Sequence, residues 1–208
     1  MANPSRERIL GRITSALKQK SPPLTLQPRP IFPPIGDLKQ RFELECKSNF
    51  TECIFTGTME ETQSRLLEVL ASLEPGVVFA EDMPFIRDRL RYAPSELRWS
   101  TEGPTPESSQ ATITRAKALI AATGSLLVTS GCGGRGGSIV APVHIVLAGK
   151  SQLMPDIESA LELAQKTGEV EKHSFVGIIT GCSRTADIEK LLVIGAHGPK
   201  RLVVFVEG

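Results

Sequence analysis

The sequence predicts an α/β domain with a mainly parallel β-sheet and helices on both faces. Uninterrupted apolar runs such as GVVFA and RLVVFVEG are typical of strands that are buried on both sides. Segments with apolar residues at helical spacing alternate with these runs along the chain. Repeated strand–helix units of this kind favour parallel strands joined by crossover helices. A length of 208 residues allows one large domain with an N-terminal extension.

Residues 1–36 are predicted to form an N-terminal helix and a proline-rich arm. Ile9, Ile13 and Leu17 recur at helical spacing, which indicates a short amphipathic helix with a basic opposite side. The stretch SPPLTLQPRPIFPPIG follows, in which the prolines remove backbone donors and favour extended structure. Residues 37–208 are expected to form the α/β domain. The arm either docks on a neighbouring subunit or lies on its own domain, and the sequence leaves both open.

Local patterns predict each element of the domain. The clearest helix start is at Thr58, which forms a T-x-x-E capping box with Glu61 before a leucine-rich stretch. Strands are expected in ECIFTG, GVVFA, ATI, SLLVTSG, VHIVLAG, FVGIITG and RLVVFVEG. Other helices are expected in DLKQRFELECKSNF, EDMPFIRDRLRYA, TRAKALIAATG, SQLMPDIESALELAQKTG and TADIEKLLVIGAHG.

Charge and composition argue against several kinds of partner. The formal charge is +1, with acidic and basic residues scattered, so neither a nucleic-acid footprint nor a polybasic membrane patch is expected. No apolar run reaches the roughly 18 residues that span a bilayer, and the N-terminus lacks a signal-peptide core, which predicts a cytoplasmic protein. The cysteines are widely spaced without a CxxC pair, so we expect no metal site and no bound cofactor.

The segment GCGGRGGS, residues 131–138, is the first candidate ligand site. Its spacing is close to that of nucleotide-binding loops, but Pro142 and a strand follow where such motifs need a helix. The loop is therefore either a mobile crossover or ordered by a ligand. For a ligand, Arg135 would meet an anion together with backbone amides. The candidate residues here are Gly131, Cys132, Arg135 and Ser138.

The segment GCSRT, residues 181–185, is the second candidate. It leaves an expected strand and enters an expected helix, whose first amides would suit an anion. Asp187 in the first turn disfavours phosphate, because it already satisfies the helix dipole. Arg184 would pair with an acid of that turn or with a substrate carboxylate. Capping by Ser183 or Thr185 explains the loop without a ligand. The candidate residues here are Gly181, Cys182, Ser183, Arg184, Thr185 and Asp187.

Both loops place Gly-Cys directly after a strand, with an arginine following. If the two strands are neighbours, Cys132 and Cys182 would face one site, where their thiolates would be reactive or bind metal. Otherwise they are small residues that fill tight turns. His144 and His197 are further ligand candidates, although a lone histidine in a strand is more often packed, and one in a last helical turn has a structural role.

At TGCSRTADIEKLLVIGAHGPKRLVVFVEG the chain resembles the lactate utilization protein C family, the LUD-domain proteins. AATGSLLVTSG and PVHIVLA match the same family in the same order, so the resemblance covers about residues 105–208. It implies a fold similar to the NagB/RpiA/CoA-transferase group. Two departures, Cys182 in place of a proline and Ala122 in place of a glutamate, mean that conserved chemistry does not follow automatically.

The resemblance implies a component of cytosolic L-lactate oxidation to pyruvate, which acts beside iron–sulfur partner subunits and has no redox cofactor of its own. A small carboxylate or another anion is the expected ligand. A second hypothesis is a stand-alone enzyme for a small phosphorylated or CoA-linked substrate, by analogy with the fold group. A third is a non-catalytic interaction subunit that binds through its N-terminal arm. A homo-oligomer is compatible with all three.

Overall fold

A computed structural model of the chain describes residues 4–18, 33–93, 96–102, 106–186, 192–195 and 197–208. The chain divides into two units, Met1–Pro33 and Pro34–Gly208. In the first unit, α1 (Pro4–Leu17) is a helix with exposed apolar side chains. None of the helices in the described ranges is both long and apolar enough to cross a membrane.

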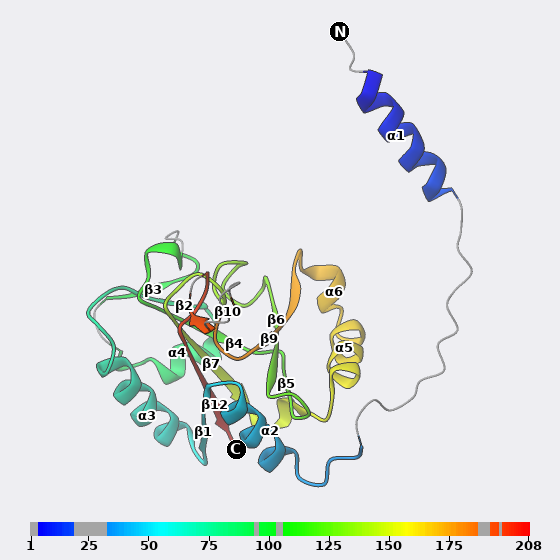
Figure 1. Cartoon of the computed structure of the whole chain (residues 1–208). Coiled ribbons are helices and arrows are strands. Elements are labelled where there is room, and N and C mark those ends of the chain that lie inside the picture. Colours follow the sequence, from blue (N-terminus) through cyan, green and yellow to red (C-terminus); the bar gives the residue numbers. More distant parts are fainter. Residues whose placement is uncertain (1–3, 19–32, 94–95, 103–105, 187–191, 196) are drawn as a thin grey trace. The chain divides into compact units, whose positions relative to one another are not determined.

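The second unit contains a six-stranded sheet in which every recorded pairing is parallel (Figure 1). The strand order is β1-β12-β7-β4-β2-β3. This architecture confirms the predicted mainly parallel α/β fold. The strands are β1 (Thr51–Thr56), β2 (Val78–Ala80), β3 (Leu97–Trp99), β4 (Ala111–Arg115), β7 (Val143–Gly149) and β12 (Arg201–Glu207).

The two faces of this sheet are covered by different layers (Figure 1). Helices α3 (Met59–Ala71) and α4 (Pro84–Arg89) pack on one face, against fully buried side chains such as Ile145 and Phe205. Helix α2 (Leu38–Ser48) and a second sheet cover the other face, against Val146 and Val204. Neighbouring residues of a strand point to opposite faces, so doubly covered strands require continuous apolar runs.

The second sheet has four strands in the order β8-β5-β6-β9. β6 pairs antiparallel with both β5 and β9, and β8 pairs parallel with β5. Helix α5 packs on this sheet through Ala160 and Ala164. The elements are β5 (Ala118–Ile120), β6 (Ser125–Thr129), β8 (Leu153–Met154), β9 (Val176–Thr180), α5 (Ile157–Lys166) and α6 (Glu169–Lys172), with 3-10 turns at Pro106–Ser108 and Lys150–Gln152.

Two of the predicted helices are wrong. TRAKALIAATG forms the end of β4, all of β5 and a turn. Its Ala118–Ala122 portion is buried on every side, whereas an amphipathic helix would leave one face exposed. The described parts of TADIEKLLVIGAHG form an antiparallel hairpin of β10 (Arg184–Ala186) and β11 (Leu192–Ile194). Cross-strand pairing of β10 with β11 outweighs the helical pattern of the segment.

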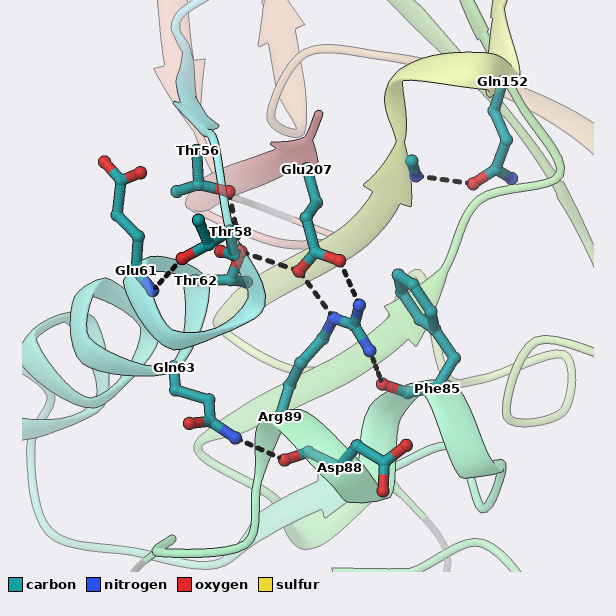
Figure 2. Close-up of polar contacts among 11 residues, drawn as sticks. Thr56, Thr58, Glu61, Thr62, Gln63, Phe85, Asp88, Arg89, Gln152 and Glu207 are labelled. Atoms are coloured by element: carbon teal, nitrogen blue, oxygen red, sulfur yellow. Dashed lines mark hydrogen bonds and ion pairs between the residues drawn. The ribbon is translucent and has the colours of Figure 1, made fainter.

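A buried ion pair lies at the carboxyl end of β12 (Figure 2). Arg89 Nε donates to Glu207 Oε2 at 2.9 Å, and the Thr62 hydroxyl donates to the same oxygen at 2.8 Å. Arg89 Nη1 also donates to the carbonyl oxygen of Phe85 at 2.7 Å. These bonds connect α3 and α4 to the last strand of the sheet.

The predicted helix start at Thr58 is confirmed. Its hydroxyl accepts a hydrogen bond from the Glu61 amide at 3.2 Å (Figure 2). The Glu61 carboxylate reaches back to accept from the Gly57 amide at 2.8 Å. The Glu61 amide in the first turn of α3 and the Gly57 amide just before the cap are therefore both satisfied locally.

Candidate functional site

Half of the candidate residues from the sequence line one pocket, which has a volume of about 290 Å³. We call it the histidine pocket. Its floor includes His144 and Leu202, which face each other in the register of β7 and β12. The predicted residues that line it are Ser138, His144, Gly181, Cys182, Ser183 and His197.

The histidine pocket lies at the amino ends of β7 and β12, whereas ligands of open parallel sheets usually bind at the carboxyl ends of the strands. The pocket lies at the amino ends because the second sheet contributes one of its walls there. β9 runs antiparallel to β6, and its carboxyl end at Thr180 leads directly into the pocket wall. The usual rule for open parallel sheets does not apply to a site built between two sheets.

His144 is completely buried in β7. Its Nε2 lies 2.8 Å from the Thr114 hydroxyl oxygen, and its Nδ1 has no hydrogen-bond partner among the described residues. The neighbouring Thr112 in the register of β4 likewise has a buried hydroxyl without a described partner. Burial lowers the pKa of the imidazole to about 3, so His144 is neutral near pH 7. A neutral imidazole offers one donor and one acceptor nitrogen.

Gly181 and Ser183 hold one wall of the histidine pocket in place. Gly181 has a φ of +73°, and a Cβ there would lie 2.3 Å from the carbonyl oxygen of Asn49. The Ser183 amide donates to the Pro199 carbonyl at 2.8 Å, and the Gly195 amide donates to the Ser183 carbonyl at 2.8 Å. The wall is therefore fixed by backbone contacts between residues far apart in the sequence.

Arg184 and Thr185 lie in β10 and are exposed. Arg184 Nη2 donates to Asn49 Oδ1 at 3.5 Å, and its guanidinium lies 5.7 Å from the centre of the Phe50 ring. Neither residue lines the histidine pocket. The predicted capping role of Ser183 or Thr185 is wrong, because a strand begins here and not a helix. The Arg184–carboxylate pair stays a prediction.

His197 is exposed and lines the histidine pocket. It follows β11, so its predicted place in a last helical turn is also wrong. The Gly198 backbone lies against Ser183, since a Cβ there would be 3.1 Å from the Ser183 Cβ. Asp187 lies outside the described residues.

The glycine-rich loop packs closely against its surroundings. Gly133 has a φ of +77°, and a Cβ there would lie 3.3 Å from the Phe79 ring. A Cβ on Gly137 would be 2.8 Å from the Gly133 carbonyl oxygen, and one on Gly131 would be 2.4 Å from the His173 ring. Close backbone approach therefore accounts for these glycines without a nucleotide.

Two other candidates in this loop lie away from the histidine pocket. Arg135 Nε donates to Ser174 Oγ at 3.2 Å at an exposed position. Cys132 is buried, and its pKa is raised by burial and by the nearby Glu81 charge. Cys182 lines the histidine pocket and Cys132 does not.

A further polar group, which the sequence analysis did not single out, lies beyond the ends of β2 and β4. Glu81 is buried, and its Oε2 accepts from the Arg115 amide at 2.8 Å. Burial raises the pKa of this carboxyl group. Lys117 Nζ and His173 Nε2 each lie 3.1 Å from Glu169 Oε2. The sequence signal for Glu81 is its position directly after the apolar run VVFA.

This group borders a second pocket of about 280 Å³, lined in part by Arg115, Lys117 and Glu169. We call it the lysine pocket. Within the described parts of the chain, no three His, Cys, Asp or Glu side chains are placed to hold a metal ion. Lys117 and the neighbouring His173 both pair with Glu169, whereas the Nε of Arg115 is buried without a hydrogen-bond partner among the described residues.

The sequence of residues 106–206 matches that of the LUD domain. This segment of the chain, residues 106–206, belongs to the LUD-domain family. The matched LUD region begins before β4 and ends within β12, so it includes the glycine-rich loop and both sides of the histidine pocket. The resemblance carried by GCSRTADIE and GAHGP is therefore confirmed.

Several relatives of this LUD-domain chain are named lactate utilization protein C. The protein from Geobacillus sp. (strain WCH70) is 27% identical, over 82% of this chain and 78% of that protein. Lactate utilization protein C 1 from Bacillus mycoides is 25% identical over 99% of this chain and 98% of that protein. The protein from Halalkalibacterium halodurans is 36% identical, but the match spans only 48% of this chain and 45% of that protein.

A solved structure shares the fold of this LUD-domain chain. The crystal structure of a DUF162 family protein from Deinococcus radiodurans matches with a TM-score of 0.63. The match covers 82% of this chain and 96% of that chain at 16% sequence identity. At this identity the likeness establishes a common fold.

Proposed function

We propose that the protein acts in lactate utilization, as a component of a system that oxidises L-lactate to pyruvate. One observation carries the proposal. Proteins named lactate utilization protein C align with the chain over most of its length, and one of them over 99% of it. The alignment extends beyond the LUD domain, so it relates whole chains and not one shared module.

Oxidation of L-lactate to pyruvate releases two protons and two electrons, and the electrons require an acceptor. The four cysteines of this chain lack the spacing of a cluster-binding motif. We therefore assign electron acceptance to iron–sulfur partner proteins, with which this chain would form a complex. In this arrangement the LUD-domain chain contributes binding and positioning.

The lining of the histidine pocket favours a small monoanion over the alternative phosphorylated or CoA-linked substrate. Its polar side chains are those of histidine, serine, threonine and cysteine, and none of its described lining residues is lysine or arginine. Phosphate groups carry more negative charge and are commonly held by arginine or lysine. A pocket with a neutral floor suits a ligand that brings one charge and keeps it near solvent.

Affinity purification tests the proposed complex. The full chain, tagged at its C-terminus, is isolated from cells grown on L-lactate and from cells grown on glucose, and the bound proteins are identified by mass spectrometry. We expect iron–sulfur proteins in the lactate sample, together with lactate-dependent reduction of an added dye. A chain that is isolated without such partners from both cultures would contradict the proposed partnership.

A further inference from the structure

We propose that the histidine pocket binds a small 2-hydroxy or 2-oxo monocarboxylate, with Nδ1 of His144 hydrogen-bonded to the oxygen on carbon 2. The choice of ligand rests on the proposed function. The position of the site rests on the geometry of the pocket alone. No lysine or arginine is required for this binding mode.

One imidazole nitrogen of His144 is unpaired among the described residues. His144 is completely buried, lines the pocket and leaves Nδ1 without a hydrogen bond to any described residue. An unpaired buried polar group costs about 1–3 kcal/mol, so such groups are rare unless they have a role. The other nitrogen is fixed at 2.8 Å from Thr114 Oγ1, which sets the orientation of the ring. A ligand oxygen at Nδ1 would satisfy a donor or acceptor that is already oriented.

Nδ1 of His144 can serve both oxidation states of the ligand. The Thr114 hydroxyl can either donate to Nε2 or accept from it. If Thr114 donates, Nδ1 carries the proton and can donate to the carbonyl oxygen of a 2-oxo acid. If Thr114 accepts, Nδ1 is unprotonated and can accept a hydrogen bond from the hydroxyl of a 2-hydroxy acid. Because burial holds the imidazole neutral, both tautomers are available.

The lining of the histidine pocket can also contact the methyl and carboxylate groups of the ligand. Leu202 is buried beside His144 and offers an apolar surface for a methyl group. The carboxylate must stay near the mouth, because a fully buried carboxylate without a cation carries a large desolvation cost. His197 is exposed and Ser183 is half-buried on the pocket wall, so both can contact a carboxylate that remains partly in water. A volume of about 290 Å³ accommodates a three-carbon acid with its first waters.

The lysine pocket is the competing site for such an anion. There Lys117 Nζ already lies 3.1 Å from Glu169 Oε2, and His173 shares that oxygen. An incoming carboxylate would have to displace or approach Glu169. Arg115 also lines the lysine pocket and has a buried Nε without a described hydrogen-bond partner, so that pocket likewise contains an unsatisfied nitrogen. We place the ligand in the histidine pocket because its unsatisfied nitrogen belongs to an oriented ring beside the apolar Leu202, and the Lys117→Met variant tests the alternative.

Two isosteric substitutions separate the roles of the two nitrogens. Glutamine places its amide near the position of Nε2, so His144→Gln keeps the Thr114 contact and removes the group at Nδ1. Asparagine places its amide near the position of Nδ1, so His144→Asn keeps a polar atom facing the ligand. Lys117→Met is the control for the lysine pocket. All variants are compared by circular dichroism and thermal unfolding before binding is measured.

Isothermal titration of the full chain with L-lactate, pyruvate and propionate tests the proposal. Propionate has the same carbon chain but no oxygen on carbon 2. We expect the wild type to bind L-lactate and pyruvate about 10-fold more tightly than propionate, the difference that one hydrogen bond makes. His144→Gln should lose about 10-fold in affinity for the first two acids, His144→Asn should lose less affinity than His144→Gln, and Lys117→Met should stay within about 3-fold of wild type.

Equal affinity of the wild type for L-lactate, pyruvate and propionate would overturn the proposal, as would the absence of saturable binding. If Lys117→Met loses affinity for the acids and His144→Gln does not, the ligand binds in the lysine pocket, which would also overturn the proposal. If His144→Gln fails to fold, the comparison of the three acids on the wild type still tests whether the oxygen on carbon 2 contributes to binding. A deletion strain that cannot grow on L-lactate, with a purified chain that binds neither acid, would refute this inference and leave the proposed function intact.

Discussion

Arg89 and Glu207 form an ion pair in which the side chains are only 8% and 16% exposed. The pair joins the end of α4 to the last residue of β12 (Figure 2). Removal of one partner leaves a buried charge without compensation, which typically costs 3–5 kcal/mol. We expect Arg89→Met to lower the free energy of unfolding by about this amount in urea denaturation.

The exposed pair of Arg65 and Glu68 provides the matched control. Its side chains are 53% and 59% exposed, and the nitrogen–oxygen distance is 2.8 Å. We expect Arg65→Met to change the free energy of unfolding by less than about 1 kcal/mol. Similar losses in the two variants would show that burial does not set the strength of the Arg89–Glu207 pair.

Acid should destabilise the protein through His144. Its pKa is lowered by burial from 6.5 to about 3 in the folded chain. Between these values the unfolded chain binds a proton and the folded chain does not, so the free energy of unfolding falls as the pH falls. The slope from this residue is about 1.4 kcal/mol per pH unit. Urea unfolding of wild type and His144→Asn between pH 7 and pH 4 measures this slope. Equal slopes in the two proteins would show that the pKa of His144 is not lowered in the folded chain.

Glu81 should make the folded chain less stable as the pH rises, opposite to the effect of His144. Burial raises its pKa above 4.5, so the folded chain keeps a proton that the unfolded chain has already lost. Its contribution to stability is present below pH 4.5 and is lost as the pH rises through the folded pKa. Glu81→Gln cannot ionise, and its amide oxygen can still accept from Arg115. We expect the stability of Glu81→Gln relative to wild type to increase from pH 4.5 to pH 8, and a constant difference in urea unfolding would contradict this.

Gly181→Ala should destabilise the chain more than Gly134→Ala. Both glycines have positive φ, +73° and +84°, which costs alanine about 1–2 kcal/mol. At Gly134 a Cβ meets nothing within 4 Å, whereas at Gly181 it would lie 2.3 Å from the Asn49 carbonyl oxygen. The clash adds about 1–3 kcal/mol. Thermal unfolding measures the difference, and equal losses would show that the Gly181 turn relaxes easily.

The sequence predicted the elements whose signals are local. The cap at Thr58 depends on Glu61 three residues later, and the strand that holds His144 is a continuous apolar run, so both were read correctly. The hairpin of β10 and β11 depends on pairing between residues such as Arg184 and Ile194, and the local pattern favoured a helix there. Tertiary pairing overrides propensity in such segments.

The same difference between local signals and long-range contacts applies to the candidate site. The sequence identified residues of the histidine pocket one loop at a time, but not the partnership of His144 with Thr114 on the adjacent strand. It also missed Glu81, whose burial follows from a contact with the amide of Arg115, 34 residues away. Strand order decides both contacts, and no local pattern specifies strand order.

Growth on L-lactate tests whether the protein acts in lactate utilization. The gene for this chain is deleted in its host, and growth is measured with L-lactate, pyruvate or glucose as the carbon source, with and without the gene restored. We expect the deletion strain to fail on L-lactate, to grow like its parent on pyruvate and glucose, and to recover when the gene is restored. Growth on L-lactate at the rate of the parent strain would contradict a role in lactate utilization.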